Sequence, residues 1–596
     1  MHTAPTTPRG ARRITPMLLL ASSVVLPWFT SSVAAATCPT ASHQIADIQG
    51  QTDISPLQGK VVTIQATVQA LLYTDSKQPQ VVLQDDSNAA LMVIETDFAR
   101  IAKVGQRWAL TGTVREIHQH TSLTNLSHSQ HCGVGTRYPA TTVQLPVKDL
   151  SQWERYEGLY LKFSQPLIVN DSHGLGRYGE LTVADKRLWV STEVAQPGDE
   201  ARALEAQQQK HQLVIDDGIW KQNAEPIRFP STGLSANHSI RVGDTLTQVE
   251  GFLVQQKPGY RLVLSQAPLH QATNPRPQVP ARAAADDLRV ASFNVLNYFT
   301  AHDKNPRFPT KRGASNADEL ARQQAKMIAA LVSLDADIIG LLEVENNGFG
   351  QGSAIQTLVQ TLNKQSPHAD YQWVEPKTSP GTDDIMVAMI YRSSKVTPIG
   401  QAATLTTGPF VRGSRPPLAQ SFTHIASAQA LTVSINHFKS KGSCPKTASP
   451  DQDQGDGQAC WNPTRVAAAQ ALSAWLKQNP TGVATEHRLI MGDLNAYRLE
   501  QPLQQLTKDG WQHLGGDKPQ ISYVFQGRSG SLDHALASAP LAAKLQRIVH
   551  LGINAEEPEV LDYNMEFKSK TAQERLFAPN EFRSSDHDPL LMDFRF

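Results

Sequence analysis

The chain has 596 residues, and its 55 Lys and Arg are balanced by 55 Asp and Glu. This length predicts about three domains, each large enough to bury its own core. Because the formal net charge is zero, bulk charge identifies no partner, and any attraction for a polyanion must come from local patches or from a bound metal.

The first residues have the pattern of an export signal. Arginines precede an apolar run over 17–29, and small residues follow at 33–36. The run is about 13 residues long, which is too short to span a bilayer. We therefore expect a signal peptide over 1–36, cleaved near Ala36, and an exported protein that is extracellular or periplasmic.

All four cysteines remain after this cleavage. An even count in an exported protein favours disulfides, and four cysteines allow three pairings. Local pairing, Cys38 with Cys132 and Cys444 with Cys460, would keep each bridge inside one domain. A zinc site is the alternative, but the sequence has no Cys-x-x-Cys spacing.

The segment 37–147 is rich in residues that favour strands. Short β-prone runs, separated by Gly and Asp-Asp-Ser turns, lie at 60–68, 80–84, 90–94 and 107–114. This spacing is typical of a small closed barrel. We predict an OB-like fold for this domain.

The segment 148–267 repeats features of the first domain. The stretch 158–163 resembles 59–64, and Val242-Gly243 has a counterpart in Val104-Gly105. Because the spacings between the copies differ, we interpret them as a diverged duplication, which predicts two β-barrels in series. A Pro- and Ala-rich segment follows over 268–286, and we expect it to be a stiff linker that forms no ladder.

Strands and helices alternate in the remaining segment, 287–596. A helical period of apolar residues runs over 318–331, and a second amphipathic helix is predicted over 464–476. Further strands are predicted at 338–343, 385–391, 430–436 and 488–491. This alternation predicts one α/β sandwich.

Acids and amides stand where several of these strands end. Glu343 closes an apolar strand, and Asp493, Asn495 and Asp586 occupy matching places elsewhere. One acid at a strand end is usually a solvated loop residue, but several in matching places indicate a shared site. A hard cation such as Mg²⁺ needs few carboxylate ligands and keeps open water positions.

Two histidines have similar positions. His437 ends an apolar strand, and His587 directly follows Asp586. A lone histidine is more often structural, but two beside clustered acids indicate proton transfer on a phosphate ester, with Asp533 as the carboxylate that would fix one tautomer. Lys439 and Lys441 would add charge for a phosphate, although as a pair they could equally be solvated.

These motifs resemble a known family. Their order resembles the ordered motifs of the endonuclease/exonuclease/phosphatase superfamily, and the sequence is most similar to bacterial extracellular nucleases of the ExeM/NucH type, which share β domains ahead of the catalytic one and segments like 177–180 and 454–457. The motifs are Phe293-Asn294, Leu342-Glu343-Val-Glu345, Asn436-His437, Gly492-Asp493-Leu-Asn495, Leu532-Asp533 and Ser585-Asp586-His587.

The resemblance implies a DNase I-like, four-layer α/β sandwich and a role for each motif residue. Asn294, Glu343 and Asp586 would hold a divalent metal, and Asp493 and Asn495 would position or activate the attacking water. His437 and His587, the latter oriented by Asp533, would contact the scissile phosphate. Tyr391 would contact phosphate or be a core aromatic.

One departure from the family pattern concerns Leu296. It stands where the abasic-site enzymes of this superfamily carry an acid. This departure argues against an abasic-site specialisation.

The expected function is therefore that of an exported endonuclease that depends on Mg²⁺, with Mn²⁺ or Ca²⁺ as further candidates. Its partner would be DNA, with RNA left open, and we expect no membrane and no obligate protein partner. A sphingomyelinase-like phosphodiesterase and a non-catalytic nucleic-acid-binding protein with a degenerate catalytic fold are the alternatives. The acids of the loop 444–460 could bind Ca²⁺, but we favour a disulfide-stapled surface loop.

Overall fold

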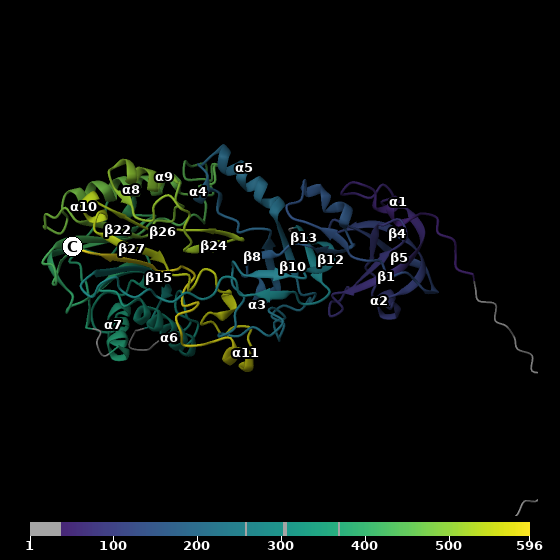
Figure 1. Ribbon diagram of the computed structural model, residues 1–596, viewed down its shortest axis with the longest axis horizontal. Helices are drawn as coiled ribbons and strands as arrows, with labels where there is room; N and C mark the ends of the chain where they lie inside the picture. Colours follow the sequence, from purple (N-terminus) through teal and green to yellow (C-terminus); the bar gives the residue numbers. More distant parts are fainter. Residues whose placement is uncertain (1–36, 257–258, 302–306, 367–369) are drawn as a thin grey trace, which may run out of the picture.

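The computed structural model describes residues 37–256, 259–301, 307–366 and 370–596. The predicted signal peptide, 1–36, lies outside the described residues. Figure 1 shows an elongated molecule with the N-terminal strands at one end, a second β region in the middle and an α/β region at the other end. No helix in the described ranges has the length and apolar composition needed to cross a membrane.

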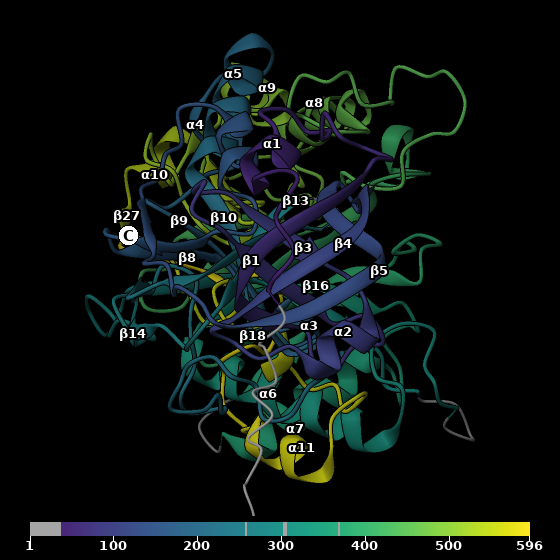
Figure 2. The same ribbon diagram turned by 90° about the vertical axis from the view of Figure 1, so that its right-hand side faces the viewer.

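The N-terminal strands form a closed barrel in the order β1-β2-β3-β5-β4, whose strands cross in front of the molecule in Figure 2. Its interior is filled by side chains such as Ile64, Leu83 and Leu110, which are fully buried. The Cys38–Cys132 disulfide ties the start of the described chain to the last strand, as predicted. The elements are α1 (Ile45–Gln49), β1 (Val61–Leu72), β2 (Gln80–Gln84), β3 (Ala90–Val93), α2 (Thr96–Ile101), β4 (Gln106–Ile117) and β5 (His120–Val134).

The middle region is a nine-stranded sheet in the order β14-β11-β8-β9-β10-β13-β12-β7-β6, where the sequence predicts a second barrel. Its elements are β6 (Thr141–Val143), η1 (Leu150–Gln152), η2 (Glu154–Tyr156), β7 (Tyr160–Phe163), β8 (Leu167–Asp171), α3 (Leu175–Tyr178), β9 (Glu180–Ala184), α4 (Ser191–Val194), α5 (Asp199–Gln208), η3 (Gln209–His211), β10 (Gln212–Asp216), β11 (Thr245–Thr247), β12 (Glu250–Gln256), β13 (Gly259–Leu264) and β14 (Leu269–Gln271).

The reason that this sheet is not a closed barrel lies between β7 and β8. These strands are separated only by 164–166, yet they stand at the two ends of the run β8-β9-β10-β13-β12-β7. One continuous strand in their place would close this run into a ring. Pro166 lies in the break, and proline has no N–H to donate to a ladder.

The segment predicted as a stiff linker is fixed to its surroundings. Residues 269–271 form β14, which pairs with β11, so the expectation that the segment forms no ladder is wrong there. Further on, Arg276 pairs with Glu557 at 2.8 Å and Arg282 pairs with Asp337 at 2.6 Å. Since Asp337 is buried, the guanidinium of Arg282 supplies the charge that this carboxylate needs.

The C-terminal region contains two six-stranded sheets, in the orders β17-β18-β16-β15-β28-β27 and β19-β20-β21-β22-β26-β23. The first uses β15 (Leu288–Tyr298), β16 (Ile338–Glu345), β17 (Tyr371–Trp373), β18 (Ile385–Arg392), β27 (Leu545–His550) and β28 (Leu590–Phe594). The second uses β19 (Val396–Thr404), β20 (Arg415–His424), β21 (Ala430–His437), β22 (Arg488–Asp493), β23 (Gln512–His513) and β26 (Asp533–Ala537).

Apolar residues of both sheets, among them Val290, Ile338, Ile435 and Met491, pack into one cluster, so the sheets lie face to face. Helices cover the outer faces: α6 (Ala317–Leu334) and α7 (Ala354–Gln365) pack on the first sheet, and α8 (Asn462–Lys477) and α9 (Gln501–Lys508) on the second. The predicted four-layer sandwich is confirmed. The remaining elements are η4 (Gly408–Phe410), the hairpin of β24 (Tyr523–Phe525) and β25 (Arg528–Gly530), α10 (Ala539–Ala542), η5 (Glu559–Leu561) and α11 (Lys570–Arg575).

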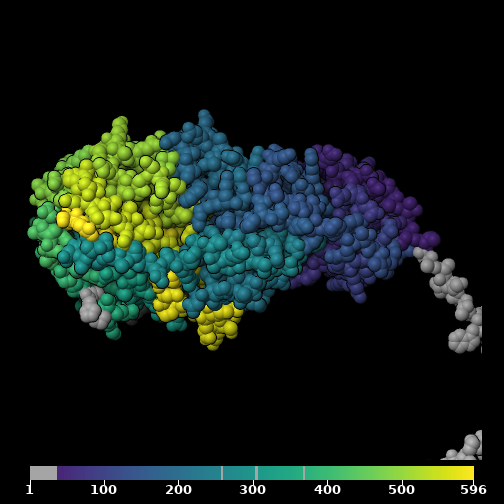
Figure 3. Space-filling view, in the orientation of Figure 1, coloured from purple at the N-terminus to yellow at the C-terminus, as the bar shows by residue number. Residues whose placement is uncertain are grey.

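The middle sheet region packs directly against the sandwich, as the contact between the blue and yellow segments in Figure 3 illustrates. Trp189 forms a bridge with Ser529 of the β24–β25 hairpin. Glu193 is fully buried and accepts hydrogen bonds from the backbone N–H groups of Gln520 at 2.9 Å and Arg498 at 3.2 Å. One acid of the middle region therefore holds two loops of the sandwich.

The segments 177–180 and 454–457 lie at this same boundary. A Cβ atom on Gly176, next to 177–180, would stand 2.6 Å from a side-chain carbon of Val560, and one on Gly457 would stand 2.9 Å from Thr192. Such approaches are closer than side-chain carbons tolerate. These glycines allow the close packing of the two regions.

The charge state of Glu193 should make stability depend on pH. Burial raises the pKa of Glu193 from its ordinary value of 4.5 to about 7, although backbone N–H bonds oppose the shift. The folded protein therefore binds this proton more tightly than the unfolded chain, so the group's contribution is present at low pH and is lost as the pH rises to about 7. The loss should be on the order of 3 kcal/mol.

We expect Glu193→Gln to remove this part of the pH dependence. The measurement is the free energy of unfolding by urea between pH 5 and pH 8, with Glu486→Gln as the control because the side chain of Glu486 is 73% exposed. Equal slopes for wild type and Glu193→Gln would contradict the assignment.

Candidate active site

Five predicted site residues lie at one edge of the two sheets, where parallel strands end. In the first sheet, Asn294 on β15 is paired in register with Leu342 of β16, directly before Glu343. In the second, His437 of β21 is paired with Asp493 of β22, which is paired in turn with Asp533 of β26. Because the carboxyl ends of parallel strands meet at one edge, side chains far apart in the chain come together.

Glu343 sits in an irregular part of its strand. The pairing of β16 with β18 shifts between Leu341 and Val344, and Glu343 has a left-handed backbone with φ of 64°. This conformation is uncommon for a residue other than glycine and is found preferentially at functional sites. The carboxylate accepts hydrogen bonds from Asn294 Nδ2 at 3.3 Å and from the Asn297 backbone N–H at 3.1 Å.

The carboxylate of Glu343 lies near that of Asp586. Burial raises the pKa of Glu343, and the negative charge of Asp586 raises it further. The loop before β28 therefore brings a second acid to the edge from which Glu343 projects. Two neighbouring acids in a buried setting form an environment that favours a cation.

His587 forms a buried pair with Asp533. Its Nδ1 is 2.7 Å from Asp533 Oδ2, which also accepts a hydrogen bond from Ser522 Oγ at 2.7 Å. Burial opposes protonation, but the carboxylates of Asp533 and Asp586 outweigh it and raise the pKa of His587 well above its ordinary value. The ring is thus a cation at neutral pH, and its Nε2–H remains for a substrate.

His437 has the opposite charge state. Burial lowers the pKa of His437 well below its ordinary value, and the nearby positive charges of Arg415 and His587 lower it further. Its Nε2 lies 3.2 Å from Arg415 Nη1 and 3.5 Å from Asp493 Oδ2. The pKa values of the two histidines are therefore shifted in opposite directions, and His587 is the one that holds a proton for donation.

Asp493 and Asn495 form the turn that follows β22. Asp493 Oδ1 accepts a hydrogen bond from the Asn495 backbone N–H at 2.8 Å, and Asn495 Nδ2 donates to Asp493 Oδ2 at 3.1 Å. Burial raises the pKa of Asp493 to about 7, although the charge of His587 opposes the shift. Asp493 can therefore accept a proton near neutral pH.

Two predicted residues do not serve the site: Tyr391 lies away from it, and the charge of Lys441 is already paired. Tyr391 is in register with Ile338, at the end of β16 far from Glu343, and its ring centroid is 5.3 Å from that of Phe422 in the core. Tyr391 is thus a core aromatic. Of the two alternatives for Tyr391, the structure favours the core aromatic, because Tyr391 lies on β18, which runs antiparallel to β16 and therefore ends at the opposite edge.

The two lysines differ. Lys441 Nζ is 2.6 Å from Glu500 Oε2 and donates to the Gln458 carbonyl, so a buried carboxylate already balances its charge. Burial lowers the pKa of Lys441 to about 8. Lys439 Nζ lies 4.9 Å from the ring centroid of Trp461, and of the two only Lys439 remains a candidate for a phosphate.

The sequence analysis missed two residues of the site. Arg415, at the start of β20, contacts His437 and pairs with Asp383 at 3.0 Å. Tyr523 has its ring centroid 4.7 Å from that of His587. Neither residue follows an apolar run that ends at the site, so no such run in the sequence points to them.

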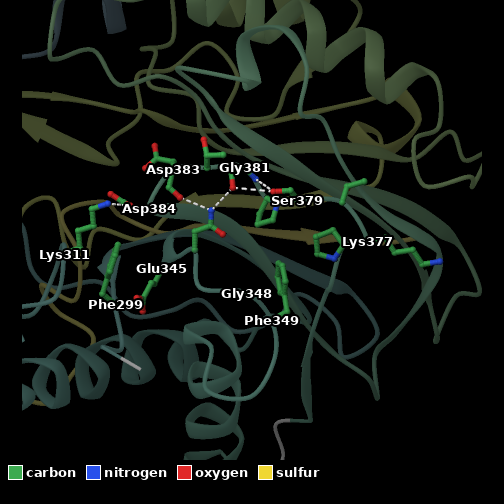
Figure 4. A pocket seen from close by; sticks show the side chains of 15 residues that line it. Phe299, Lys311, Glu345, Gly348, Phe349, Lys377, Ser379, Gly381, Asp383 and Asp384 are labelled. Atoms are coloured by element: carbon green, nitrogen blue, oxygen red, sulfur yellow. Dashed lines mark hydrogen bonds and ion pairs between the residues drawn. The ribbon is translucent and has the colours of Figure 1, made fainter. Parts of the chain in front are cut away.

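A groove of about 540 Å³ lies beside Glu343 and begins at its neighbours Glu345 and Asn346. Figure 4 shows side chains from β16 and from the segment 376–384 around it, with Phe299 and Phe349 on one side. Asn346 Nδ2 donates to the carbonyls of Gly381 at 3.1 Å and Asp383 at 2.8 Å, which fixes one wall. The groove can therefore hold a part of a substrate that extends from the site.

The residues expected to bind a metal fit a cation that keeps most of its waters. Within the described ranges, no group of three or more His, Cys, Asp or Glu side chains is arranged as a metal cage. Glu343 and Asp586 offer carboxylate oxygens, and the hydrogen bonds that the Glu343 carboxylate accepts come from uncharged N–H groups. The amide oxygen of Asn294 accepts a hydrogen bond from the Leu296 backbone N–H at 3.0 Å, so this amide would have to turn to bind a cation. Few protein oxygens at an open edge suit a hard divalent ion such as Mg²⁺.

The loop 444–460 is closed by the predicted Cys444–Cys460 disulfide. Its acids are engaged locally: Asp451 accepts from Thr464 Oγ1 at 2.8 Å, and Asp456 Oδ1 accepts from the Gln458 backbone N–H at 2.9 Å. The loop also docks on the middle region, where Arg202 donates to the Gly455 carbonyl at 3.0 Å. It is part of the boundary between the two regions.

A family profile and several solved structures are similar to this chain. The profile of the Endonuclease/Exonuclease/phosphatase family matches residues 291–587, whereas a search of curated proteins gives no match. Solved structures similar to the chain include a humanized D. rerio TDP2 (13% identity, TM-score 0.32, covering 52% of this chain and 100% of that chain), the human Nocturnin catalytic domain with bound sulfate (16%, 0.33, 52% and 95%) and a mannosyl-6-phosphatase from Bacteroides thetaiotaomicron (16%, 0.33, 52% and 100%).

Members of this family are hydrolases that act on phosphodiester bonds, and they generally use divalent metals. The segment that the profile matches contains every residue of the site described above, from Asn294 to His587. Through its residues 291–587, this chain belongs to the Endonuclease/Exonuclease/phosphatase family.

Proposed function

We propose that the protein is an exported, Mg²⁺-dependent endonuclease that hydrolyses phosphodiester bonds of DNA, and of RNA where a single strand reaches the site, with low sequence preference. The observation that carries the proposal is the buried contact of His587 Nδ1 with Asp533 Oδ2 at 2.7 Å, together with His437 Nε2, which lies 3.5 Å from Asp493 Oδ2. A phosphodiester needs both a proton acceptor for water and a donor for the leaving oxygen.

The roles follow from the contacts of each group. Asp493 takes the proton from the attacking water, which Asn495 orients, while the water oxygen forms its bond to phosphorus. His587, held by Asp533, donates a charged hydrogen bond to the phosphate and gives its proton to the leaving oxygen as the P–O bond breaks. His437 and Arg415 contact the remaining phosphate oxygens.

Asn294, Glu343 and Asp586 would hold the divalent ion, which supplies charge neutralisation at the phosphate when it is bound. Mg²⁺ is the proposed ion because the ligands are few and are oxygens, while Mn²⁺ and Ca²⁺ share this preference and are to be compared with it.

Nucleic acid is favoured over a lipid substrate because of the surface around the site. A lipid phosphodiesterase needs an exposed apolar segment that enters a membrane. In the part of the sandwich that the structure describes, the exposed large apolar residues stand apart in the sequence: Val332, Val411, Ile425, Phe525 and Phe567. The groove beside Glu343 is lined mainly by polar and charged side chains and glycine.

Export is proposed from the signal-like N-terminus and from the two disulfides, Cys38–Cys132 and Cys444–Cys460. Disulfides persist in oxidising compartments outside the cytosol. A mass measurement of the secreted protein would locate the cleavage site.

Removing a metal ligand or the charged histidine should abolish most of the activity. We expect Glu343→Gln and His587→Ala each to reduce the initial rate of supercoiled plasmid cleavage by on the order of 10² or more, because one loses a metal ligand and the other a proton donor. Chelator should abolish cleavage by wild type, and a panel of Mg²⁺, Mn²⁺ and Ca²⁺ should restore it to different extents.

Tyr391→Phe is the matched control for these variants, and its rate should stay within about twofold of wild type because surface or core changes away from a site rarely alter the chemistry. Since a closed circle has no ends, cleavage of the plasmid also distinguishes an endonuclease from an exonuclease. If wild type left plasmid intact in each metal but hydrolysed sphingomyelin, the proposal would be wrong.

The pair formed by Asp533 and His587 generates a separate prediction. In Asp533→Asn the pKa of His587 should fall by roughly one to three units, because the carboxylate that stabilises the imidazolium is gone. Histidine NMR titration in chelator measures this, with His587→Ala to assign the signal and Asp509→Asn as the control. A slow Asp533→Asn enzyme with an unchanged His587 titration would show that Asp533 acts on something else.

A further inference from the structure

A second cavity lies at the junction between the barrel and the middle sheet, away from the candidate active site. Its volume is about 770 Å³, which is within the range of small-molecule sites. The barrel contributes the loop 75–80, β3 and the turn between β4 and β5, while the middle region contributes Trp220, Lys221 and the end of β12. In Figure 1 this junction lies toward the end of the molecule opposite the C-terminus.

Four side chains that line this cavity each carry a buried polar atom without a hydrogen-bond partner among the described residues. The atoms are Gln80 Oε1, His120 Nε2, Gln255 Oε1 and Gln256 Nε2. A buried polar group that lacks a partner destabilises the fold, so native proteins rarely keep one without water, an ion or a ligand to satisfy it. Small rotations of these side chains would bring the atoms to a molecule that occupies the cavity.

The identities of these atoms define the partner. The two Oε1 atoms require donors, and Gln256 Nε2 requires an acceptor. His120 Nδ1 faces Glu157 at 3.0 Å, so its Nε2 is the ring nitrogen without a partner. The partner must therefore present donors and acceptors side by side, as the edge of a nucleobase does.

The walls of the cavity suit the face of a base. Trp220 is 56% exposed, and Tyr73 contacts it edge-on with ring centroids 5.7 Å apart, which fixes the indole. The backbone N–H groups of Trp220 and Lys221 donate to Asp75 at 3.0 and 2.9 Å, so the platform is fastened to the barrel loop. Bases stack on such aromatic platforms without regard to sequence.

The rim of the cavity suits a phosphate backbone. Lys77, from the barrel, and Lys221, from the middle region, are both exposed and line the cavity. The carboxylate of Asp75 is occupied by the two backbone N–H groups just described. Two lysine charges at the mouth favour a polyanion.

We propose that this cavity binds one unpaired nucleotide of a single strand, with the base stacked on Trp220, its edge bonded by Gln80, His120 and Gln255, and its phosphate near Lys77 and Lys221. The inference rests on the proposed nuclease function and adds a second contact with the substrate, remote from the cut. The barrel would then retain a strand while the sandwich cleaves elsewhere along it.

Binding is measured in chelator, so that no cleavage occurs, by the anisotropy of a labelled single strand of about 12 nucleotides, a length within the range that such grooves bind. Trp220→Ala should raise its Kd by about 10-fold or more, since one stacked base is lost. Gln255→Leu, which keeps the size but removes the amide, should raise it about 5-fold or more. Gln207→Leu, exposed on α5, is the control and should bind as wild type does.

Several readouts keep the two proposals separate. Both cavity variants should cut duplex plasmid within about twofold of wild type and should unfold at the same temperature. If they also bound the strand as wild type does, or if a neutral oligosaccharide displaced it from wild type, the cavity assignment would be overturned while the nuclease proposal stood. If plasmid were not cut by wild type but strand binding still depended on Trp220, only the nuclease proposal would fail.

Discussion

The hydrogen bond between Asp533 Oδ2 and His587 Nδ1, 2.7 Å long and buried, is the contact on which the site depends. A buried carboxylate without a charged partner is strongly destabilising, so β26 and the loop before β28 must meet at this point. Neighbouring contacts enforce the meeting: the Asp588 backbone N–H donates to the Ser522 carbonyl at 2.8 Å, and Ser522 Oγ bonds Asp533. Burial sets the direction of the pKa shifts of Glu343, His437 and Asp493, and the charge of His587 lowers the pKa of all three.

Much of the site was predictable from sequence because it follows one physical rule. An apolar strand that ends in a polar side chain marks the edge of a sheet, and Glu343, His437 and Asp493 follow such apolar runs. Asp533 begins its strand, so the family resemblance and not this rule identifies it. Arg415 begins its strand and follows no apolar run, so the same rule cannot find it. The ion pair between Lys441 and Glu500 could not be predicted either, because an ion pair between residues 59 positions apart has no local sequence pattern.

Some parts of the fold could be predicted from the sequence and others could not. Periodicity predicts an α/β sandwich, the family resemblance implies its four layers, and local pairing predicts the two disulfides; all of these are present. The middle region differs from the predicted second barrel because closure depends on whether one strand stays continuous, and the break at 164–166 decides this. A duplicated pattern therefore predicts the presence of strands more reliably than the way in which they close.

The boundary between the middle region and the sandwich has a consequence for how such chains diversify. Glu193, Arg241 and the glycines at 176 and 457 pack against the boundary surface of the sandwich. Against a different surface, buried charges such as those of the Arg241–Glu557 pair would lose their partners. The sandwich could not be exchanged for a free-standing relative by cutting at residue 286 and splicing. Evolution of this architecture must then have changed both faces together.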